Sequence, residues 1–249
     1  MHDKLVALVT GANQGIGLQI AKDLAAHGYT VLVGSRSLPN GEAAAQAIGA
    51  AAHAVQLDVT KPDSIGAAAA YIRHTFGRLD VLVNNAAIAH AGQPGRSSAK
   101  IMHDSRASAA SLDEVRAVFE TNVFGVVAVT QALLPLLREA PAARIVNVSS
   151  ALGSLTLNTD PTFPFRAGYS VVYAASKTAL NAVTLAFAIE LENTNIKVNL
   201  SSSGYTKTAM NNFEGTDTVE QGAQDMVRLV LDADAPTGTF TWPGGALPW

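Results

Sequence analysis

The regular alternation of short apolar runs with Ala-rich stretches constrains the fold of this 249-residue chain more than any other feature of its sequence. Runs such as 5–10 and 30–35 are rich in Val and Leu, and each is followed by a stretch of helical composition. Strands that alternate with helices predict a parallel sheet with helices on both faces. These runs contain few polar residues, which agrees, because a strand buried on both faces has no solvent side.

The alternation predicts a doubly wound α/β fold with a mostly parallel, seven-stranded sheet. The expected strands are residues 5–10, 30–35, 53–59, 79–86, 143–150, 196–201 and 238–242. The expected helices are residues 15–28, 41–50, 62–77, 112–139, 170–192 and 219–231. No internal repeat and no linker-like change of composition interrupts the pattern, so we expect one domain over residues 1–249.

Composition narrows the possible function classes. Hydrophobic residues make up 48% and charged residues 15% of the chain, which supports a large core and argues against disorder. The net charge of −3 gives no basic surface for nucleic acid. The chain has no cysteine and its six histidines are scattered, so we expect neither a disulfide nor a metal site.

The N-terminus and the apolar windows give no sign of export or membrane insertion. The first residues reach a strand-like run without the basic and long apolar regions of a signal peptide. The most apolar long window, 179–191, is too short to span a bilayer and contains Asn181, Thr184 and Glu190. We therefore expect a cytoplasmic protein without a membrane partner.

One long segment, 89–110, does not belong to the alternating pattern. It is rich in Ala, Ser and Gly and follows a strand, so it is either a functional loop or a solvated excursion. Ser111 and Glu114 then form the spacing of a capping box, which predicts that regular helix restarts there.

The turn between the first strand and the first helix is rich in glycine. The stretch "VTGANQGIG" places Gly11, Gly15 and Gly17 at this junction with the spacing G-x-x-x-G-x-G. Glycines at a strand-to-helix turn let backbone N–H groups approach a pyrophosphate at the positive N-terminus of the helix. The turn therefore predicts a dinucleotide site, supported by its position in the alternating pattern.

A second feature is the stretch "YSVVYAASK", which spaces Tyr169, Tyr173 and Lys177 four residues apart. On a helix these positions share one face, one turn apart. A phenol of ordinary pKa near 10 is a poor proton-transfer partner at neutral pH, and a neighbouring ammonium lowers that pKa. We therefore predict Tyr173 as an acid/base and Lys177 as the group that tunes it. Tyr169, two turns from Lys177, is expected to be a pocket wall or a packing residue.

Four motifs, "LVTGANQGIG", "NNA" at 84–86, "VNVSS" and "YAASK", stand in the order and at the distances seen in one family. The sequence resembles the short-chain dehydrogenases/reductases, in the short single-domain form and closest to the carbonyl reductase-like members. The likeness runs from about Lys4 to the C-terminus. It implies a Rossmann-like dinucleotide-binding and catalytic domain, a nicotinamide cofactor and a small carbonyl or alcohol substrate.

The resemblance also implies site residues. Tyr173 and Lys177 match the family's Y-x-x-x-K, in which the lysine also binds the nicotinamide ribose. Ser150, at the end of "VNVSS", matches the serine that holds the substrate oxygen, and Asn122 matches a helix asparagine that holds a water beside the lysine. The implied cofactor-binding positions, besides Tyr173 and Lys177, are Gly11, Asn13, Gln14, Gly15, Ile16, Gly17, Asp58, Val59, Asn85, Ala86, Gly204, Thr206 and Thr208.

The form of the cofactor is predicted from the end of the second strand. In dinucleotide folds an acidic residue there holds the ribose of NAD, whereas an arginine accommodates the extra phosphate of NADP. The sequence has Arg36 after Ser35 and no carboxylate before Glu42. A guanidinium can bond the phosphate with two hydrogen bonds, so we predict NADP(H).

The distance from Ser150 to Tyr173 is 23 positions, about twice that in many relatives. The added residues, within 157–168, include Pro161, Phe163, Pro164 and Phe165. We predict a lid or pocket wall with an aromatic surface for an apolar substrate, the alternative being a surface bulge.

Together these features predict an NADPH-dependent carbonyl reductase that acts in reverse as an alcohol dehydrogenase. A catalytically silent, NADP(H)-sensing regulator on the same fold is the alternative, although such proteins typically lose the tyrosine or the lysine. A lyase without cofactor is disfavoured by the intact glycine turn. We expect a homo-oligomer, dimer or tetramer, through the helices 112–139 and 171–192, with a monomer left open if the lengthened segment covers that face.

Overall fold

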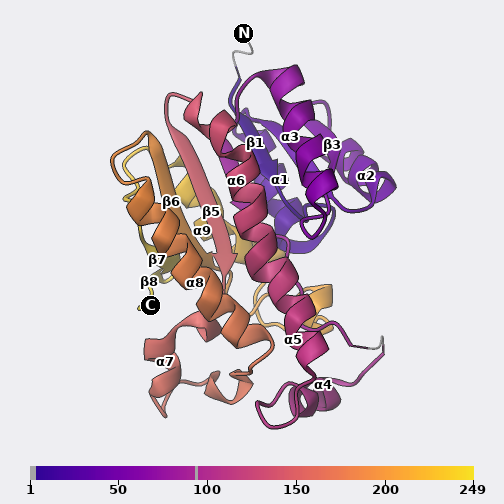
Figure 1. The fold of residues 1–249 in the computed structure, drawn as a ribbon, viewed down its shortest axis with the longest axis vertical. Coiled ribbons are helices and arrows are strands. Elements are labelled where there is room, and N and C mark those ends of the chain that lie inside the picture. Colours follow the sequence, from indigo (N-terminus) through magenta and orange to yellow (C-terminus); the bar gives the residue numbers. More distant parts are fainter. Residues whose placement is uncertain (1–3, 93–94) are drawn as a thin grey trace.

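An eight-stranded sheet forms the centre of the molecule in the computed structural model, which describes residues 4–92 and 95–249 (Figure 1). The strands lie in the order β3-β2-β1-β4-β5-β6-β7-β8. Among these strands β8 alone is antiparallel to its neighbour. The sheet grows outward from β1 in both directions, so its crossover helices cover both faces and the predicted doubly wound fold is confirmed.

Seven strands correspond to the seven predicted ones, with ends that differ by a few residues. They are β1 (Val6–Val9), β2 (Thr30–Ser35), β3 (Ala52–Gln56), β4 (Val81–Asn84), β5 (Ala143–Ser149), β6 (Ile196–Ser202) and β7 (Phe240–Trp242). The eighth, β8 (Gly245–Ala246), was not predicted. It has two residues and pairs with β7 across a tight hairpin, so it is too short to show an apolar pattern.

The helices also follow the predicted order, with two additions. They are α1 (Gly15–Ala26), α2 (Leu38–Ile48), α3 (Pro62–Phe76), α4 (Ser98–Asp104), α5 (Leu112–Phe119), α6 (Gly125–Arg138), α7 (Leu155–Thr159), α8 (Tyr173–Glu190) and α9 (Val219–Leu231). The short helices α4 and α7 lie in segments predicted to be irregular. The predicted helix 112–139 is continuous, but a π-helical turn, Glu120–Phe124, joins α5 to α6.

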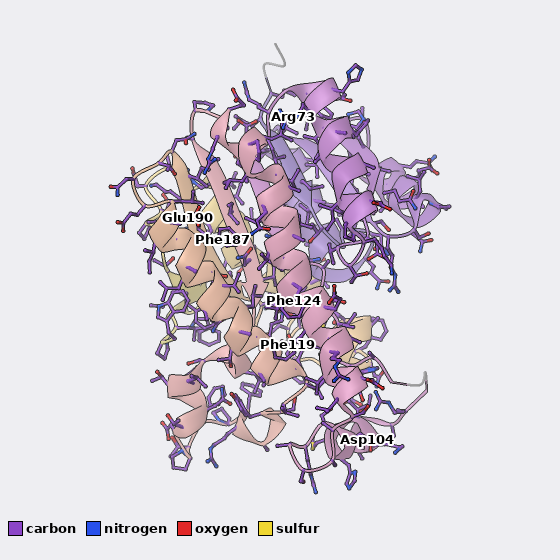
Figure 2. The ribbon with its side chains drawn as sticks, viewed as in Figure 1. Arg73, Asp104, Phe119, Phe124, Phe187 and Glu190 are labelled. Atoms are coloured by element: carbon purple, nitrogen blue, oxygen red, sulfur yellow. The ribbon has the colours of Figure 1, made fainter. Side chains whose placement is uncertain are left out.

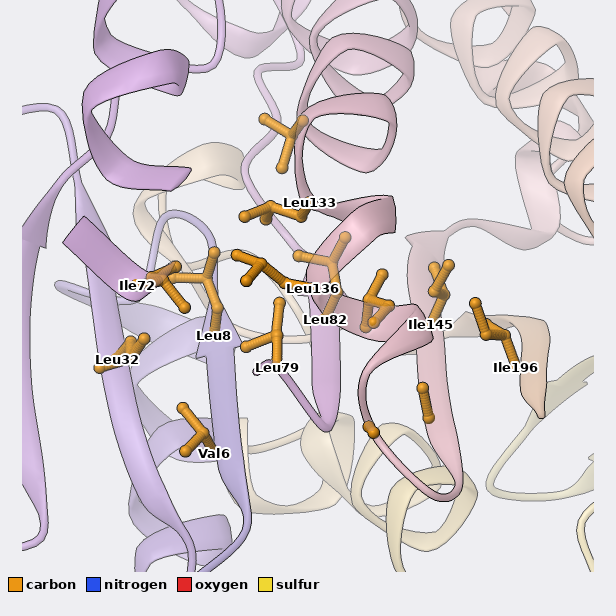
Figure 3. Packing of buried hydrophobic residues seen from close by; sticks show 14 of the residues in the cluster. Val6, Leu8, Leu32, Ile72, Leu79, Leu82, Leu133, Leu136, Ile145 and Ile196 are labelled. Atoms are coloured by element: carbon orange, nitrogen blue, oxygen red, sulfur yellow. The ribbon is translucent and has the colours of Figure 1, made fainter. Parts of the chain in front are cut away.

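Successive residues of each strand supply the cores on the two faces of the sheet. In β1, Val6 and Leu8 belong to the core that packs against α3, α6 and α8. Ala7 and Val9 belong to the core that packs against α1, α2 and α9. Figure 3 shows the first of these cores, with Leu133 and Leu136 of α6 lying over Leu8 and Leu82. This two-sided burial explains why β1 is apolar at every position and why the other central strands are mostly apolar.

A chain of buried polar side chains crosses the apolar core. Asn84 of β4 donates one hydrogen bond to Thr130 of α6 at 3.2 Å and another to Asn147 of β5 at 2.8 Å. Asn147 in turn donates to Thr184 of α8 at 2.8 Å. All four residues are at most 3% exposed. These bonds fix the relative positions of two strands and two helices with geometry that apolar packing alone does not provide.

Within the described residues, one helix has the length and composition to cross a bilayer. It is the continuous run Leu112–Arg138, with a mean hydropathy of 1.5 over its most apolar window, and 44% of that window is buried within the protein. The helix packs on the sheet through Val129, Leu133 and Leu136, and this packing accounts for its apolar face.

The carboxyl ends of the parallel strands meet at one edge of the sheet. The glycine turn follows β1, Arg36 follows β2, Asn85 follows β4, and Ser150 follows β5. Figure 1 shows α4 and α7 at this same end of the molecule, on either side of the N-terminal end of α8. Ligands of open α/β sheets bind at such an edge.

Candidate active site

The glycine turn is packed too closely for side chains. Gly11 and Gly15 have φ angles of +63° and +57°, which favour glycine. A Cβ on Gly17 would lie 2.7 Å from the carbonyl oxygen of Gly11 and would also overlap the side-chain amide of Asn85. The turn therefore needs all three glycines for its own geometry, and its backbone is left accessible.

Asn85 and Ala86 lock this turn to the end of β4. The backbone N–H groups of both residues donate to the hydroxyl of Thr10 at 3.0 Å. The side chain of Asn85 donates to the carbonyl oxygens of Thr10 and Gly11, at 2.9 and 3.2 Å. Asn85 is therefore a brace of the glycine turn, a role that the sequence alone did not reveal.

A cleft of about 970 Å³ opens beside the glycine turn. Of the predicted cofactor residues, those lining it are Gly11, Asn13, Gln14, Gly15, Ile16, Gly17, Arg36, Asp58, Val59, Asn85, Ala86 and Thr208. The N-terminus of α1 has no side-chain cap and no acidic residue in its first turn. Its free N–H groups suit a pyrophosphate, and a carboxylate would have opposed one. The residues present thus fit a nicotinamide dinucleotide.

Arg36 is exposed at the end of β2 and lines the cleft. No residue of the described chain forms an ion pair with its guanidinium. It acts at a distance on Asp58: burial raises the pKa of that carboxyl, but hydrogen bonds from Thr60 and the charges of Lys61 and Arg36 outweigh it and lower the pKa overall. Arg36 is thus free to bind an anion.

Ser150, Tyr173 and Lys177 come together where β5 ends and α8 begins. The Ser150 hydroxyl lies near enough to the Tyr173 phenol to lower its pKa, and the Lys177 ammonium lies 5.7 Å from the centre of the Tyr173 ring. Lys177 is 2% exposed and donates to the carbonyl oxygen of Val148 at 2.8 Å. The structure therefore brings the three predicted catalytic groups into one cluster.

Tyr173 is the first residue of α8, so the predicted start of the helix at 170 is wrong. Its N–H donates to the Ser170 hydroxyl at 3.1 Å, which ends the preceding turn. Tyr169 therefore lies outside the helix, and its side chain lines an open groove beside α7 together with Phe163 and Arg166.

The expected lowering of the Tyr173 pKa is wrong in direction. Burial raises the pKa of Tyr173 to about 12, and the hydrogen bond to Ser150 offsets only part of this rise. Burial also lowers the pKa of Lys177 to about 7, because a desolvated ammonium is unfavourable. The prediction counted the attraction between the two groups but not their desolvation in the folded protein, where Lys177 is buried and Tyr173 partly so.

Asn122 lies in the π-helical turn and is 1% exposed. Its side-chain oxygen accepts from the N–H of Ile88 at 2.9 Å. Its amide donates to the Ile88 carbonyl and to the Ser176 hydroxyl, at 2.9 and 3.0 Å. The oxygen and the amide nitrogen of the side chain are therefore both engaged by other groups of the protein. π-Helical turns are frequent at functional sites.

The segment after β6 contributes differently than predicted. Thr208 lines the cleft, but Gly204 and Thr206 do not. Thr206 is 4% exposed, and its hydroxyl donates to the carbonyl oxygen of Ser203 at 2.8 Å. The predicted cofactor role of Gly204 and Thr206 therefore has no support in the cleft. Lys207, which was not predicted, lies in the cleft wall instead.

The segment 89–110 is tied to α5 by charge. Arg96 forms ion pairs with Glu114 and Asp104, and the backbone N–H groups of Ala91 and Gly92 also donate to Glu114. The Arg96 guanidinium is the main cause that lowers the pKa of Glu114, against a smaller rise from burial. Helix α5 starts after Ser111 as predicted, but the capping box is wrong, because the Ser111 side chain makes no capping bond and Glu114 turns to Arg96.

The lengthened segment 157–168 gathers aromatic rings beside the site. Phe165 lies 5.8 Å from Phe163 and 6.1 Å from Tyr205, measured between ring centres. Tyr205 belongs to the segment after β6, so the rings join two irregular segments.

Among the described residues, no group of three His, Asp or Glu side chains is placed to hold a metal ion.

Comparisons with known proteins agree with this geometry. Residues 5–218 match the family model described as short chain dehydrogenase. Short-chain dehydrogenase anuI of Penicillium roqueforti is 36% identical over 238 residues, which cover 92% of this chain and 89% of that protein. The chain belongs to the short-chain dehydrogenase family.

Solved structures show the same likeness. The structure of salutaridine reductase from Papaver somniferum superposes with a TM-score of 0.79 at 28% identity, covering 96% of this chain and 99% of the other. That of 3-ketoacyl-(acyl-carrier-protein) reductase from Brucella melitensis, complexed with NADH, gives 0.78 at 28% identity and covers 96% of each chain. The protein is therefore an oxidoreductase of a family that binds nicotinamide cofactors and includes reductases of carbonyl compounds.

Proposed function

We propose that the protein is an NADPH-dependent carbonyl reductase, which acts in reverse as an alcohol dehydrogenase on small ketones or aldehydes. The observation that carries this proposal is the contact between the Ser150 hydroxyl and the Tyr173 phenol, with the Lys177 ammonium 5.7 Å from the centre of the Tyr173 ring. The cluster lies at the carboxyl edge of the sheet, where the cofactor cleft also opens.

A carbonyl reduction needs a hydride on carbon and a proton on oxygen. NADPH supplies the hydride when it is bound. The Ser150 hydroxyl and the Tyr173 phenol both donate hydrogen bonds to the substrate oxygen, and Tyr173 gives up its proton as negative charge develops there. The alkoxide of the product is a stronger base than phenolate, so the proton moves toward the alcohol.

The two pKa shifts suit the direction of reduction. With its pKa raised to about 12, Tyr173 is protonated at neutral pH and available as a donor. Lys177, with its pKa lowered to about 7, exchanges protons readily near neutral pH and returns the proton to Tyr173 after each turnover. In this proposal the backbone of the turn around Asn122 holds the water that links Lys177 to solvent.

The preference for NADPH rests on Arg36. Its exposed guanidinium lines the cleft, and no described carboxylate pairs with it. A phosphate on the adenosine ribose is the group that such a guanidinium binds best, through two charge-assisted hydrogen bonds. Asp58, which accepts two hydrogen bonds from Thr60, stays ionised at neutral pH, and the charge of Arg36 contributes to the lowering of its pKa.

We further propose that the protein forms a homo-oligomer through α6 and α8. Phe124, at the end of the π-helical turn, is 56% exposed, and Ile189 of α8 is 59% exposed. Figure 2 shows Phe124 on the side of the molecule that α6 and α8 cover. Figure 1 places α7 beyond the N-terminal end of α8, so the lengthened segment leaves this face open. Light scattering on the purified protein tests this point, and a clean monomer mass would contradict it.

The reductase proposal is tested by following NADPH and NADH absorbance at 340 nm against aromatic ketones, aldehydes, diketones and α-keto esters. Wild type is expected to consume NADPH with at least one of these. Tyr173→Phe is expected to lose roughly 10²- to 10⁴-fold in rate while binding NADPH normally. Binding of NADPH without consumption across the panel would instead favour a regulatory sensor, and no binding would refute the cofactor site.

A further inference from the structure

The short helix α7 is folded back onto the turn that follows Ser150. The side-chain nitrogen of Asn158 lies 3.3 Å from the carbonyl oxygen of Ala151, 3.2 Å from that of Leu152 and 2.7 Å from that of Ser154. A single amide thus contacts three of the four carbonyls of the turn 151–154, while the fourth, that of Gly153, accepts from Asn181. Because Asn158 lies in the lengthened segment, that segment is structurally part of the serine's own turn.

One of these contacts reaches the Ser150 hydroxyl through a single peptide group. The N–H of Leu152 donates to the Ser150 hydroxyl at 3.2 Å. That N–H belongs to the same planar peptide unit as the Ala151 carbonyl that Asn158 holds. Since the plane is rigid, fixing its carbonyl end also fixes the direction of its N–H end. Asn158 therefore helps to fix the N–H that donates to the Ser150 hydroxyl.

The orientation of the Asn158 amide is determined by its surroundings. Rotating the amide by half a turn would place its oxygen against three carbonyl oxygens, where it has nothing to accept. In the observed orientation the oxygen is buried and has no hydrogen-bond partner among the described residues. The hydrogen bonds of the Asn158 amide are therefore all made by its nitrogen, and its oxygen is left unpaired.

A second asparagine holds the other side of the same turn. Asn181 of α8 accepts from the Ser149 hydroxyl at 2.6 Å and donates to the Gly153 carbonyl at 3.1 Å. A Cβ on Gly153 would lie 2.9 Å from the backbone of Lys177, so the turn also packs directly on the helix that carries the acid/base. With Asn181 fixing the turn to α8, the Ala151 carbonyl of the peptide plane in its middle is held by two donors, the N–H of Ser154 at 3.1 Å and the side chain of Asn158 at 3.3 Å.

We propose that Asn158 is a positioning residue, which orients the Ser150 hydroxyl toward Tyr173 by holding the Ala151–Leu152 peptide. Its effect on turnover rests on the reductase function proposed above. Its effect on the contact between Ser150 and Tyr173 does not, so the two can be tested separately.

The structural test uses the NMR signal of the tyrosine ring carbon that bears the hydroxyl, in protein labelled with ¹³C at that carbon. The Tyr173 signal is assigned by its loss in Tyr173→Phe. Ser150→Ala removes the contact and shifts this signal at neutral pH. Asn158→Ala is expected to shift it in the same direction, whereas Thr159→Ala, one residue further along α7, whose hydroxyl bonds only Thr156, is expected to leave it in place. An unmoved signal in Asn158→Ala overturns the proposal, even if the variant is less stable.

The kinetic test measures kcat and KM on a carbonyl that wild type reduces. Asn158→Ala is expected to lower kcat by roughly 10- to 100-fold with an unchanged KM for NADPH, because a misplacement of about 1 Å is this costly. Asn158→Asp, which keeps the volume but replaces the donor with an acceptor, gives the same readouts if the alanine variant does not fold. A wild-type kcat in either variant overturns the proposal. If wild type reduces nothing, the reductase function fails while the NMR comparison still decides the role of Asn158.

Discussion

The cofactor side and the proposed substrate side of the active-site edge differ in the groups that shape them, which are backbone groups on the first side and side-chain contacts on the second. The cofactor side, at the ends of β1, β2 and β4, is shaped by backbone: close-packed glycines, an uncapped helix terminus and N–H groups bound to Thr10. The substrate side, around Ser150 and Tyr173, is shaped by side chains that tie irregular segments together, such as Asn158 and the pair of Arg96 with Glu114.

The difference teaches which properties of the site are free to vary. A surface formed by backbone groups changes only when the backbone conformation changes, so it stays the same among proteins with the same fold. A surface made of side-chain contacts between loops changes with single substitutions. The cofactor class therefore follows from the family. We expect the substrate to be selected by the segments 89–110, 157–168 and 205–217, which differ most from the regular pattern.

The strongest way to break this contrast is Gly17→Ala. The added Cβ meets the Gly11 carbonyl at 2.7 Å and the Asn85 side chain, so the turn has to move. Overpacking of this kind costs roughly 1–3 kcal/mol, and we expect at least a tenfold rise in the NADPH dissociation constant together with a lower melting temperature. Fluorescence titration and thermal unfolding measure both.

The matched control is Gly66→Ala, in the middle of α3, where an added Cβ would meet no atom within 4 Å. It is expected to raise stability by about 0.5–1 kcal/mol and to leave NADPH binding unchanged. Equal loss of NADPH binding in both variants would show that the close packing of the glycine turn is not what cofactor binding requires.

The second-largest effect is expected from Arg36→Asp. Arg36 is the side chain that we expect to distinguish NADPH from NADH. Loss of a charged hydrogen-bond pair and repulsion from the new carboxylate should lower the ratio of kcat/KM for NADPH over NADH by roughly 10- to 100-fold. Arg73→Asp makes the same charge change at the far end of the molecule and should leave the ratio alone (Figure 2). An Arg36→Asp enzyme that still prefers NADPH would refute the assignment.

A smaller effect is expected from Lys177 on the pH dependence of stability. Its pKa is about 7 in the folded protein against an ordinary value of 10.5, so the unfolded chain binds the extra proton between these pH values. Lys177 therefore favours the folded state fully above about pH 10.5, and this contribution is lost as the pH falls toward 7.

Lys177→Met removes that dependence. From pH 7 to 9 the free energy of unfolding of wild type should rise relative to the variant, by at most about 1.4 kcal/mol per pH unit. Urea denaturation at several pH values measures the difference, in which all other titrating groups cancel. Parallel curves for the two proteins would mean that Lys177 keeps its charge in the folded state.

The smallest expected effect sharpens the substrate side. Phe165→Ala removes the ring that contacts Phe163 and Tyr205. We expect KM for a bulky aromatic ketone to rise by a few fold, consistent with the 0.5–1.5 kcal/mol of an aromatic pair, and KM for NADPH to stay constant. Tyr71→Ala, which removes an exposed ring on α3, is the control. A KM for the ketone that does not change would show that the rings form only a surface bulge.

The same contrast explains what the sequence could predict. The seven longer strands, the glycine turn and the pair of Tyr173 and Lys177 depend on periodicity and short spacings, which are visible in the chain. Ser150 was predicted from the family resemblance, because it lies 23 positions before Tyr173. Helix α7 and the role of Asn158 depend on a match between one amide and three carbonyls, and no residue pattern shows it. The strand β8 has too few residues to form a pattern.

Two errors share a physical cause. Glu114 was expected to cap α5 and binds Arg96 instead, and Tyr173 was expected to have a lowered pKa and has a raised one. Each expectation treated neighbours in sequence as the whole environment. In the folded chain, a partner 18 residues away and burial under other segments are the larger influences.

The buried chain of Thr130, Asn84, Asn147 and Thr184 has a consequence for how the sequence can drift. Replacing one member by an apolar residue leaves its neighbour with an unpaired buried group, at a cost of about 1–3 kcal/mol. Once that cost is incurred, replacing the neighbour costs much less. The four positions are therefore epistatic: the effect of a substitution at one of them depends on the residues at the other three. A substitution that is harmful alone becomes tolerable once its neighbour has changed, so these positions are expected to change together although they are distant in the sequence.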